Sequence, residues 1–274
     1  MKFESDPNNE LDVERIRTET SLAEVLFFER VGSTNDEAIR WVSDSANRCP
    51  IMALARNQER GRGQRQTSWS SGEGSLTFSL GLDTNSIHCR PTLIPLTVGV
   101  SLCQVIQQLG LDELVQIKWP NDVIIGRKKA GGILIETVGT NRVVIGIGLN
   151  VNNETAHIET RTVGLEGAIS LKSACGKSIR ITDLLIQCAN AVCDNLAHQQ
   201  AETQTLAAYD QRSLLSGCSL EIEQPDGQIL IGRCMGFSPD GNLILANDNE
   251  LEKPINVASG QIRRIEYPDQ SYPA

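Results

Sequence analysis

The sequence predicts an α+β protein in which a mixed sheet-and-helix domain is followed by a small, SH3-like β-barrel. From Leu22 to about Ser216, strand-like apolar runs are interspersed with segments whose apolar residues recur at helical spacing. After Gly217, short apolar runs are separated by closely spaced turn signals, a pattern typical of small all-β domains. These sequence patterns divide the chain into an N-terminal arm (1–20), a mixed domain (21–216), a β-barrel domain (217–268) and a tail (269–274).

Composition indicates an ordinary globular chain. Of 274 residues, 40% are hydrophobic and 22% are charged, and the formal net charge is −9. That sign disfavours a protein whose main surface binds nucleic acid. Basic residues do cluster at Arg60–Arg65 and at Arg127–Lys129. A local positive cleft on an acidic body suits a small ligand that carries phosphate.

The eight cysteines are scattered without a C-x-x-C pair, and the three histidines are isolated. This pattern predicts reduced, mostly buried cysteines and no metal site, as expected of a cytoplasmic protein. The sequence has no evident signal peptide or membrane-spanning run.

The first elements are a polar arm, a strand and a helix. Residues 1 to about 20 are expected to be disordered or loosely packed. Ala23–Val31 reads as a strand, and Gly32 to Glu37 follow as G-S-T-N-D-E. Thr34 and Glu37 have the spacing of a capping box ahead of a helix at Ala38–Val42. Capping alone would explain these polar residues, although the free N–H groups of a helix N-terminus also suit a polar ligand.

A basic, glycine-containing loop connects two further strand-like runs, Ile51–Ala55 and Ser75–Leu80. Residues 57–69 read N-Q-E-R-G-R-G-Q-R-Q-T-S-W. Within the loop, Gly61-Arg62-Gly63 resembles an anion nest, where unobstructed backbone N–H groups lie beside a guanidinium. The loop matches neither the P-loop pattern nor the dinucleotide-binding fingerprint.

The middle of the mixed domain contains two core helices and a hairpin. Leu93–Leu109 and Ile181–Leu196 carry apolar residues at helical spacing. Val115–Trp119 reads as a strand that stops at Pro120, which has no N–H to donate. Residues 123–125 continue extended, Gly126-Arg127 makes a turn, and residues 133–135 form the returning strand.

The hairpin carries the most informative residues. It reads K-W-P-N-D at 118–122 and K-A-G-G-I-L-I-E at 129–136. Gly131 and Gly132 let another molecule approach the backbone, and Lys129 can reach an anion lying there. Residues 143–152, V-V-I-G-I-G-L-N-V-N, then form a buried strand with two glycines and an asparagine towards its end.

In the C-terminal part, the turn signals are Pro225-Asp-Gly227, Pro239-Asp-Gly241 and Asn247-Asp-Asn249. Turns at this spacing leave room only for short strands, which predicts the small barrel.

Taken in order, these pieces resemble the biotin protein ligases, which make biotinyl-adenylate and transfer biotin to a carrier lysine. The resemblance covers roughly residues 20–155. It rests on S-T-N at 33–35, Q-x-x-G-R-G at 58–63, Trp69, K-W-P-N-D at 118–122, K-A-G-G-I-L-I-E at 129–136 and G-I-G-L-N at 146–150. It implies a class II synthetase-like, SH2-like catalytic domain followed by an SH3-like barrel, which agrees with the prediction from the pattern.

The resemblance also implies roles for individual residues. Lys129 and Arg62 would bring the biotin carboxylate and the α-phosphate of ATP together, and Asp122 would orient or deprotonate the carrier lysine. The implied biotin-binding residues are Ser33, Thr34, Asn35, Gln58, Gly61, Arg62, Trp69, Lys129 and Gly132. The implied nucleotide-binding residues are Gly63, Lys118, Asn121, Asp122 and Asn150, which would also meet the Mg²⁺ that accompanies ATP.

Two departures from the family pattern concern the nucleotide. Gln64 and Gln66 stand where the family's loop is usually richer in arginine and glycine, so either Arg65 substitutes or the adenylate is held less tightly. In the barrel, Arg263 and Arg264 are candidates for an arginine near the nucleotide, with an ambiguous register.

The implied partner is a biotin carboxyl carrier protein of acetyl-CoA carboxylase or a similar carboxylase. The S-T-N motif begins at Ser33, which leaves no room for an N-terminal helix-turn-helix domain, so an enzyme that does not bind DNA is expected. No membrane partner is expected either, because no membrane-spanning run is evident. A homodimer remains open.

Three alternatives remain. A lipoate- or octanoate-transferring enzyme of similar fold is disfavoured because no R-R-x-S-G-G-G-type motif is present. A non-catalytic ligand-sensing or nucleic-acid-binding module is disfavoured by the net charge. A globular protein whose loops have no ligand is disfavoured by the ordered occurrence of the motifs.

Overall fold

The computed structural model describes residues 6–64, 67–111, 115–158, 163–198, 201–246 and 253–268. Its first sheet has seven strands in the order β1-β2-β3-β7-β6-β5-β4. Only the β1–β2 pair is parallel, and the other neighbours are antiparallel. The strands are β1 (Glu24–Val31), β2 (Ile51–Gln58), β3 (Ser75–Asp83), β4 (Val115–Lys118), β5 (Asp122–Ile125), β6 (Lys128–Val138) and β7 (Arg142–Asn150).

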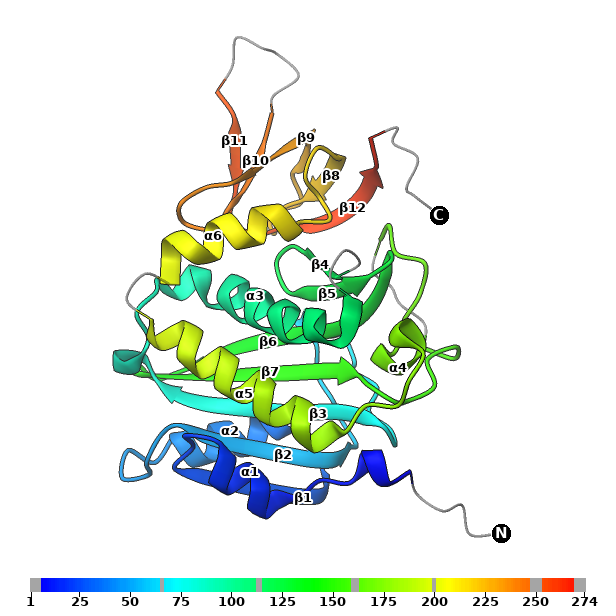
Figure 1. Cartoon of the computed structure of the whole chain (residues 1–274). Coiled ribbons are helices and arrows are strands. Elements are labelled where there is room, and N and C mark those ends of the chain that lie inside the picture. Colours follow the sequence, from blue (N-terminus) through cyan, green and yellow to red (C-terminus); the bar gives the residue numbers. More distant parts are fainter. Residues whose placement is uncertain are drawn as a thin grey trace.

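Helices cover both faces of this sheet, because alternate residues of each strand point to opposite sides. On β2, Met52 and Leu54 join the main core, whereas Ile51 and Ala53 pack with α2 in a second, smaller cluster. The helices of this domain are α1 (Val13–Glu19), α2 (Thr34–Val42), α3 (Ile94–Ile106), α4 (Leu171–Cys175), α5 (Ile181–Ala197) and α6 (Ala201–Arg212). Figure 1 shows α3 and α5 crossing in front of the strands.

Short helical turns flank these elements: η1 (Pro7–Asn9), η3 (Thr84–Ser86), η4 (Pro91–Leu93) and the π-turn η5 (Gln107–Leu111). The two predicted core helices are confirmed as α3 and α5, each with a largely buried apolar face. Together, η4, α3 and η5 form one helix from Pro91 to Leu111 that is long and apolar enough to cross a membrane by composition. In its most apolar stretch of 18 residues, 67% of the residues are buried, and the helix packs against the sheet, α5 and α6. We therefore interpret it as the core helix of the fold.

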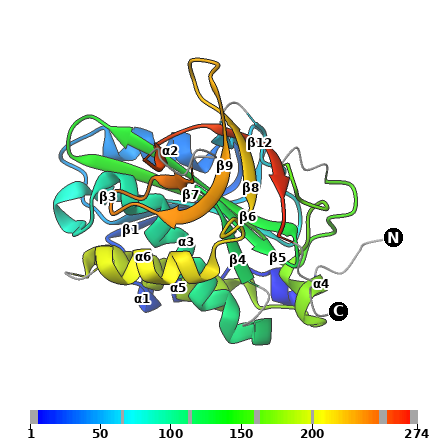
Figure 2. The same ribbon diagram turned by 90° about the horizontal axis from the view of Figure 1, so that it is seen from above.

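The predicted all-β C-terminal domain is confirmed as a five-stranded antiparallel sheet in the order β11-β10-β9-β8-β12. Its strands are β8 (Ser219–Glu223), β9 (Ile229–Phe237), β10 (Leu243–Leu245), β11 (Ile255–Val257) and β12 (Gln261–Glu266). The sheet lies at one end of the molecule, beyond α6 and the β4–β5 hairpin (Figure 1), and in the view from above its strands lie in front of the large sheet (Figure 2). The predicted turn at 247–249 lies outside the described residues.

All eight cysteines are free thiols, and four of them are buried. Burial raises the pKa of the Cys103 and Cys188 thiols to about 12, because the thiolate is poorly solvated in the core. These two side chains therefore serve packing.

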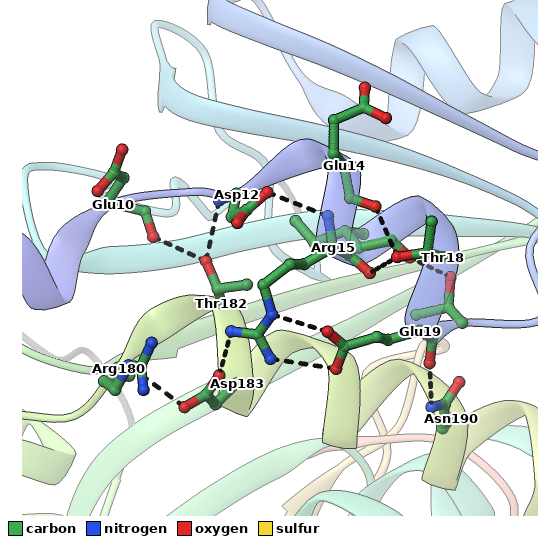
Figure 3. Close-up of polar contacts among 12 residues, drawn as sticks. Glu10, Asp12, Glu14, Arg15, Thr18, Glu19, Arg180, Thr182, Asp183 and Asn190 are labelled. Atoms are coloured by element: carbon green, nitrogen blue, oxygen red, sulfur yellow. Dashed lines mark hydrogen bonds and ion pairs between the residues drawn. The ribbon is translucent and has the colours of Figure 1, made fainter.

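The expected loosely packed arm is wrong for residues 6–20. Asp12 caps α1 by accepting a hydrogen bond from Arg15 N at 3.0 Å, and Ile16 is fully buried against the core. Figure 3 shows how α1 is tied to α5: Arg15 pairs with Asp183 at 2.7 Å, and Thr182 accepts from the Asp12 N–H at 3.0 Å. Polar composition suggested disorder, but one apolar residue per turn and long-range polar partners suffice to dock this short helix.

We expect Ile16→Ala to lower the free energy of unfolding by about 2–5 kcal/mol, because truncating a fully buried isoleucine loses apolar burial and leaves a cavity. Urea unfolding of the whole chain measures this. Thr18→Ala on the exposed side of the same helix is the matched control and should change stability by less than about 0.5 kcal/mol. Equal stabilities for the two variants would contradict the docking of α1.

Candidate active site

A cavity of about 760 Å³ lies above the middle of the seven-stranded sheet. Its walls come from the β1–α2 junction, the loop after β2, the β4–β5 turn, the segment after β7 and the start of β12. The C-terminal sheet therefore contributes to the same cavity as the large sheet.

The sheet face that forms the floor of the cavity leaves open space because small residues lie side by side on it. Ser79 pairs with Gly146, and Gly148 pairs with both Thr77 and Gly132, so one face of β3, β7 and β6 carries small side chains side by side. Larger residues at the intervening positions point into the core on the other face.

At two positions of β7, neighbouring side chains leave room only for glycine. A Cβ on Gly146 would lie 2.2 Å from Oδ1 of Asn35, and a Cβ on Gly148 would lie 2.4 Å from Cε2 of Trp69. The indole of Trp69 thus packs directly on the strand. Its Nε1 is buried without a hydrogen-bond partner within the described ranges, which leaves a donor at the cavity wall.

One end of the cavity is an uncharged polar network. Oε1 of Gln58 accepts from the N–H of Thr34 at 2.7 Å and from its hydroxyl at 3.0 Å. The Ser79 hydroxyl lies 2.7 Å from Thr34 Oγ1 and 2.6 Å from Asn35 Oδ1. Ser33, Thr34, Asn35 and Ser79 are buried, so this end offers several hydroxyl and amide groups to a neutral polar headgroup.

The predicted capping box is wrong. The N-cap of α2 is Ser33, not Thr34, and the Ser33 side chain makes no capping hydrogen bond. Thr34 instead turns inward to Gln58 and Ser79, and Glu37 pairs with Arg40. The Thr34 hydroxyl bonds with tertiary partners instead of capping the helix. The polar residues at the start of α2 therefore belong to the cavity and are more than a helix cap.

The opposite end of the cavity is charged. Nζ of Lys129 lies 2.6 Å from Oδ1 of Asp122, and both side chains are largely shielded from solvent. The amide of Asn121 donates to the Ile133 carbonyl at 2.8 Å, and Asn150 accepts from Asn153 at 3.0 Å. Buried Lys118 lines the same end.

A β-bulge brings Lys129 to this face. Asp122 pairs with Gly132 and Val123 with Gly131, but Ile124 pairs with Lys129, which leaves Ala130 as an extra residue in β6. Strict alternation would place Lys129 on the face opposite Gly132. The extra residue reverses the alternation, so a Cβ on Gly132 would lie 3.5 Å from Nζ of Lys129.

Arg62 lies at the rim of the cavity, held by two carboxylates. Its guanidinium contacts Glu136 at 2.9 and 3.0 Å and Asp36 at 2.7 Å. Glu136 also accepts from Nδ2 of Asn35 at 2.6 Å, so it joins the basic loop to the neutral network. The loop closes on itself, because Gly63 N donates to the Thr67 carbonyl at 2.7 Å. Arg65 and Gln66 lie outside the described residues.

The structure brings the residues implied by the resemblance together. All of them except Gly61 line the cavity, and Gly61 contacts it indirectly, since its carbonyl accepts from the N–H of Trp69 at 2.9 Å. Arg263 and Arg264 do not line it and pair instead with Glu223 and Glu266.

Sequence reasoning missed several residues of the site. Glu136 and Asp36 hold Arg62, and the period-two spacing of Thr77 and Ser79 opposite two glycines could have marked the floor. The segment after β7 and the start of β12 had no local signal. From these two segments the cavity is lined by His157, Ile158, Val163, Ala168, Gly260, Gln261 and Ile262.

Comparison with protein families gives one domain match. Residues 27–152 match the family described as the Biotin/lipoate A/B protein ligase family. The matched range contains the basic loop, the β4–β6 hairpin and β7, and so most of the cavity.

Among curated proteins, the chain is similar to the biotin–acetyl-CoA-carboxylase ligase of Mycobacterium tuberculosis, at 26% identity over 79% of this chain and 80% of that protein. It is also similar to the bifunctional ligase/repressor BirA of Bacillus subtilis, at 26% identity over 87% of this chain and 74% of that protein.

Among solved structures, the biotin protein ligase of Aquifex aeolicus in complex with biotin and ATP has a TM-score of 0.73 at 23% identity, covering 88% of this chain and 99% of that chain. The biotin protein ligase of Leishmania major in complex with biotinyl-5-AMP has a TM-score of 0.60 at 21% identity, covering 86% and 99%. These likenesses establish the fold, including the C-terminal β domain.

Proposed function

We propose, from the premise that residues 27–152 form a domain of the biotin/lipoate A/B protein ligase family, that this chain is an ATP-dependent biotin protein ligase. The observation that carries the proposal is one cavity with a neutral hydrogen-bonding end and a lysine–aspartate end, both built on a single hollow sheet face. Those two ends suit the uncharged ring system and the carboxylate of biotin, respectively.

In the proposed first step, a carboxylate oxygen of biotin attacks the α-phosphorus of ATP. The bond from that phosphorus to the bridging oxygen breaks, and pyrophosphate leaves with the electron pair. Because carboxylate and triphosphate repel each other, the reaction needs cations at their meeting point. Lys129 and Arg62 supply them, after exchanging their carboxylate partners for the substrates. Asp122 and Asn150 would offer oxygen atoms to the Mg²⁺ that accompanies ATP, and that ion would neutralise part of the phosphate charge.

In the proposed second step, the uncharged amine of a carrier lysine attacks the acyl carbon of biotinyl-5′-AMP. The acyl carbon–oxygen bond breaks, AMP leaves and an amide forms. Asp122 accepts the proton that the amine loses. The carrier is a biotin carboxyl carrier protein, as supported by the named activity of the Mycobacterium tuberculosis relative.

Trp69 would cover the intermediate. Its indole lies on Gly148 beside the cavity, and its Nε1 is a buried donor that a bound ligand could satisfy. Excluding water there would slow hydrolysis of the mixed anhydride.

The proposal is tested by biotin-dependent exchange of pyrophosphate into ATP on the purified chain, with octanoate and lipoate measured in parallel. Exchange with biotin alone is the expected result. Exchange with octanoate or lipoate instead would assign the chain to the lipoate branch that the family description also covers. Absence of pyrophosphate exchange with all three acids would favour the non-catalytic alternative and overturn the proposal.

Gln64 gives a separate prediction about retention of the intermediate. It lines the cavity in the basic loop but carries no charge. We expect Gln64→Arg to reduce release of free biotinyl-5′-AMP about tenfold, because one charge-assisted hydrogen bond contributes about 1.5–3 kcal/mol. Released adenylate is quantified by chromatography in the absence of carrier. Gln228→Arg, in an exposed turn of the C-terminal sheet, controls for added charge. Equal leakage from Gln64→Arg and wild type would refute the idea.

A further inference from the structure

Arg127 occupies a backbone conformation that its side chain type rarely adopts. Its φ is +64°, and within the described ranges it is the single non-glycine residue with positive φ. The turn between β5 and β6 requires this left-handed geometry, for which glycine or asparagine is the less strained choice. A strained conformation of this kind persists only where contacts with the surrounding structure hold it.

The side chain of Arg127 lies against the C-terminal sheet. Its guanidinium carbon is 4.0 Å from the centroid of the Tyr267 ring, immediately after β12. Its Nε lies 3.5 Å from Oε1 of Glu166, close enough for an ion pair but without hydrogen-bond geometry. A guanidinium over an aromatic face gains a cation–π attraction, so this contact joins the two sheets.

The loop that carries Glu166 is fastened to the same place. The hydroxyl of Tyr267 donates to the Gly164 carbonyl at 2.9 Å. Gly164 has φ of +79°, and a Cβ there would lie 2.7 Å from Cδ1 of Ile265 in β12. The loop therefore packs closely on the end of the C-terminal sheet.

This loop in turn holds the main chain of the predicted catalytic lysine. The N–H of Glu166 donates to the Arg127 carbonyl at 2.9 Å, and the N–H of Lys129 donates to the Gly167 carbonyl at 2.9 Å. The N–H of Ile169 donates to the Lys129 carbonyl at 3.0 Å. Residues 166–169 thus run beside residues 127–129 like a short extra strand.

The same strand that carries this contact also walls the cavity. Gly260, just before β12, and Gln261 and Ile262 at its start line the cavity, whereas Ile265 near its end and Tyr267 just after it hold the loop. Both views place β12 next to the β5–β6 hairpin (Figures 1 and 2). A displacement of the C-terminal sheet would therefore move both the cavity wall and the backbone of Lys129.

The geometry points to Arg127 and Tyr267 as positioning residues that form a clasp between the C-terminal sheet and the strand of Lys129. The clasp sets the lysine relative to the α-phosphate while β12 covers the cavity. This inference rests on the proposed ligase function for its kinetic consequence. Neither residue touches the reacting atoms, so substrate affinity at the biotin end is expected to be independent of the clasp.

The test uses Arg127→Gly, Tyr267→Ala and the double variant of the full chain. Glycine at 127 removes the side chain and also relieves the backbone strain, so thermal stability should not fall. In pyrophosphate exchange, each single variant should lose about ten- to a hundredfold in kcat, because misplacement by about 1 Å has effects of that size. The KM for biotin should stay within about twofold in the same assays.

The kcat of the double variant should be no lower than that of the more impaired single variant, since both substitutions remove one clasp. Arg233→Ala on the exposed side of β9 is the control.

A second measurement does not need activity. Deuterium exchange of the peptide covering residues 127–133 should be faster in both single variants than in wild type or Arg233→Ala, because the Lys129 N–H loses its support. Unchanged protection in this peptide, or multiplicative losses of kcat in the double variant, would overturn the clasp. If the wild-type protein shows no pyrophosphate exchange with biotin, octanoate or lipoate, the proposed function fails. The deuterium-exchange experiment alone then decides whether the clasp exists. Tyr267→Phe, which keeps the ring, should lie between wild type and Tyr267→Ala in both measurements.

Discussion

Lys129→Ala is expected to lower kcat for biotin-dependent pyrophosphate exchange by about 10²–10³-fold or more, the size of effect seen when one preorganised electrostatic group is removed. The Lys129 ammonium is held 2.6 Å from Asp122 in a largely shielded end of the cavity, where charge acts more strongly than in water. In the proposed mechanism, this ammonium neutralises the charge where the biotin carboxylate meets the α-phosphate.

The neighbouring lysine provides the matched control. Lys128 begins β6 and does not line the cavity, so Lys128→Ala removes a positive charge one residue away and should leave kcat nearly unchanged. Because Lys129→Ala also leaves Asp122 without its ion-pair partner, circular dichroism must show that the variant folds. A folded Lys129→Ala protein with kcat within tenfold of wild type would remove this lysine from the mechanism.

Gly146→Ala is expected to lower kcat/KM for biotin by about 10²-fold, mostly through a higher KM, by displacing the neutral hydrogen-bond network. The added methyl would lie 2.2 Å from Oδ1 of Asn35, a distance that no real contact allows. Asn35 must then leave Ser79 and Glu136, to which it is bonded at 2.6 Å in each case. Because Glu136 holds Arg62, the disturbance should also reach the basic loop.

Gly99→Ala controls for the replacement of a buried glycine. Its methyl would meet Ile117 at 3.5 Å, an ordinary van der Waals distance, and it lies in core helix α3 away from the cavity. Kinetics at varied biotin with saturating ATP separate KM from kcat. A biotin KM for Gly146→Ala equal to that of Gly99→Ala would mean that Asn35 does not take part in binding biotin.

The two core helices and the main strands of the mixed domain could be predicted because each has an apolar pattern of its own, whereas α4 and α6 were not predicted. Ile94–Ile106 and Ile181–Ala197 are helices where apolar residues recur at helical spacing, and the strand from Val115 ends before Pro120 as expected. The N-terminal helix could not be predicted in the same way. Its only buried residue is Ile16, and its other anchors, such as Asp183, are distant in the sequence.

The sequence by itself predicted a large part of the cavity lining, because the conspicuous loops and glycines occur in a recognisable order, and all of the residues predicted from them except Gly61 line one cavity. Only the tertiary structure decided how they are arranged. The extra residue at Ala130 turns Lys129 towards Asp122, and pairing across β3, β7 and β6 sets small residues side by side. Arg62 meets Glu136 and Asp36, and β12 closes the wall, through contacts between residues far apart in the chain. Local pattern reports the periodicity of one segment, whereas register and packing between segments depend on partners that no single segment specifies.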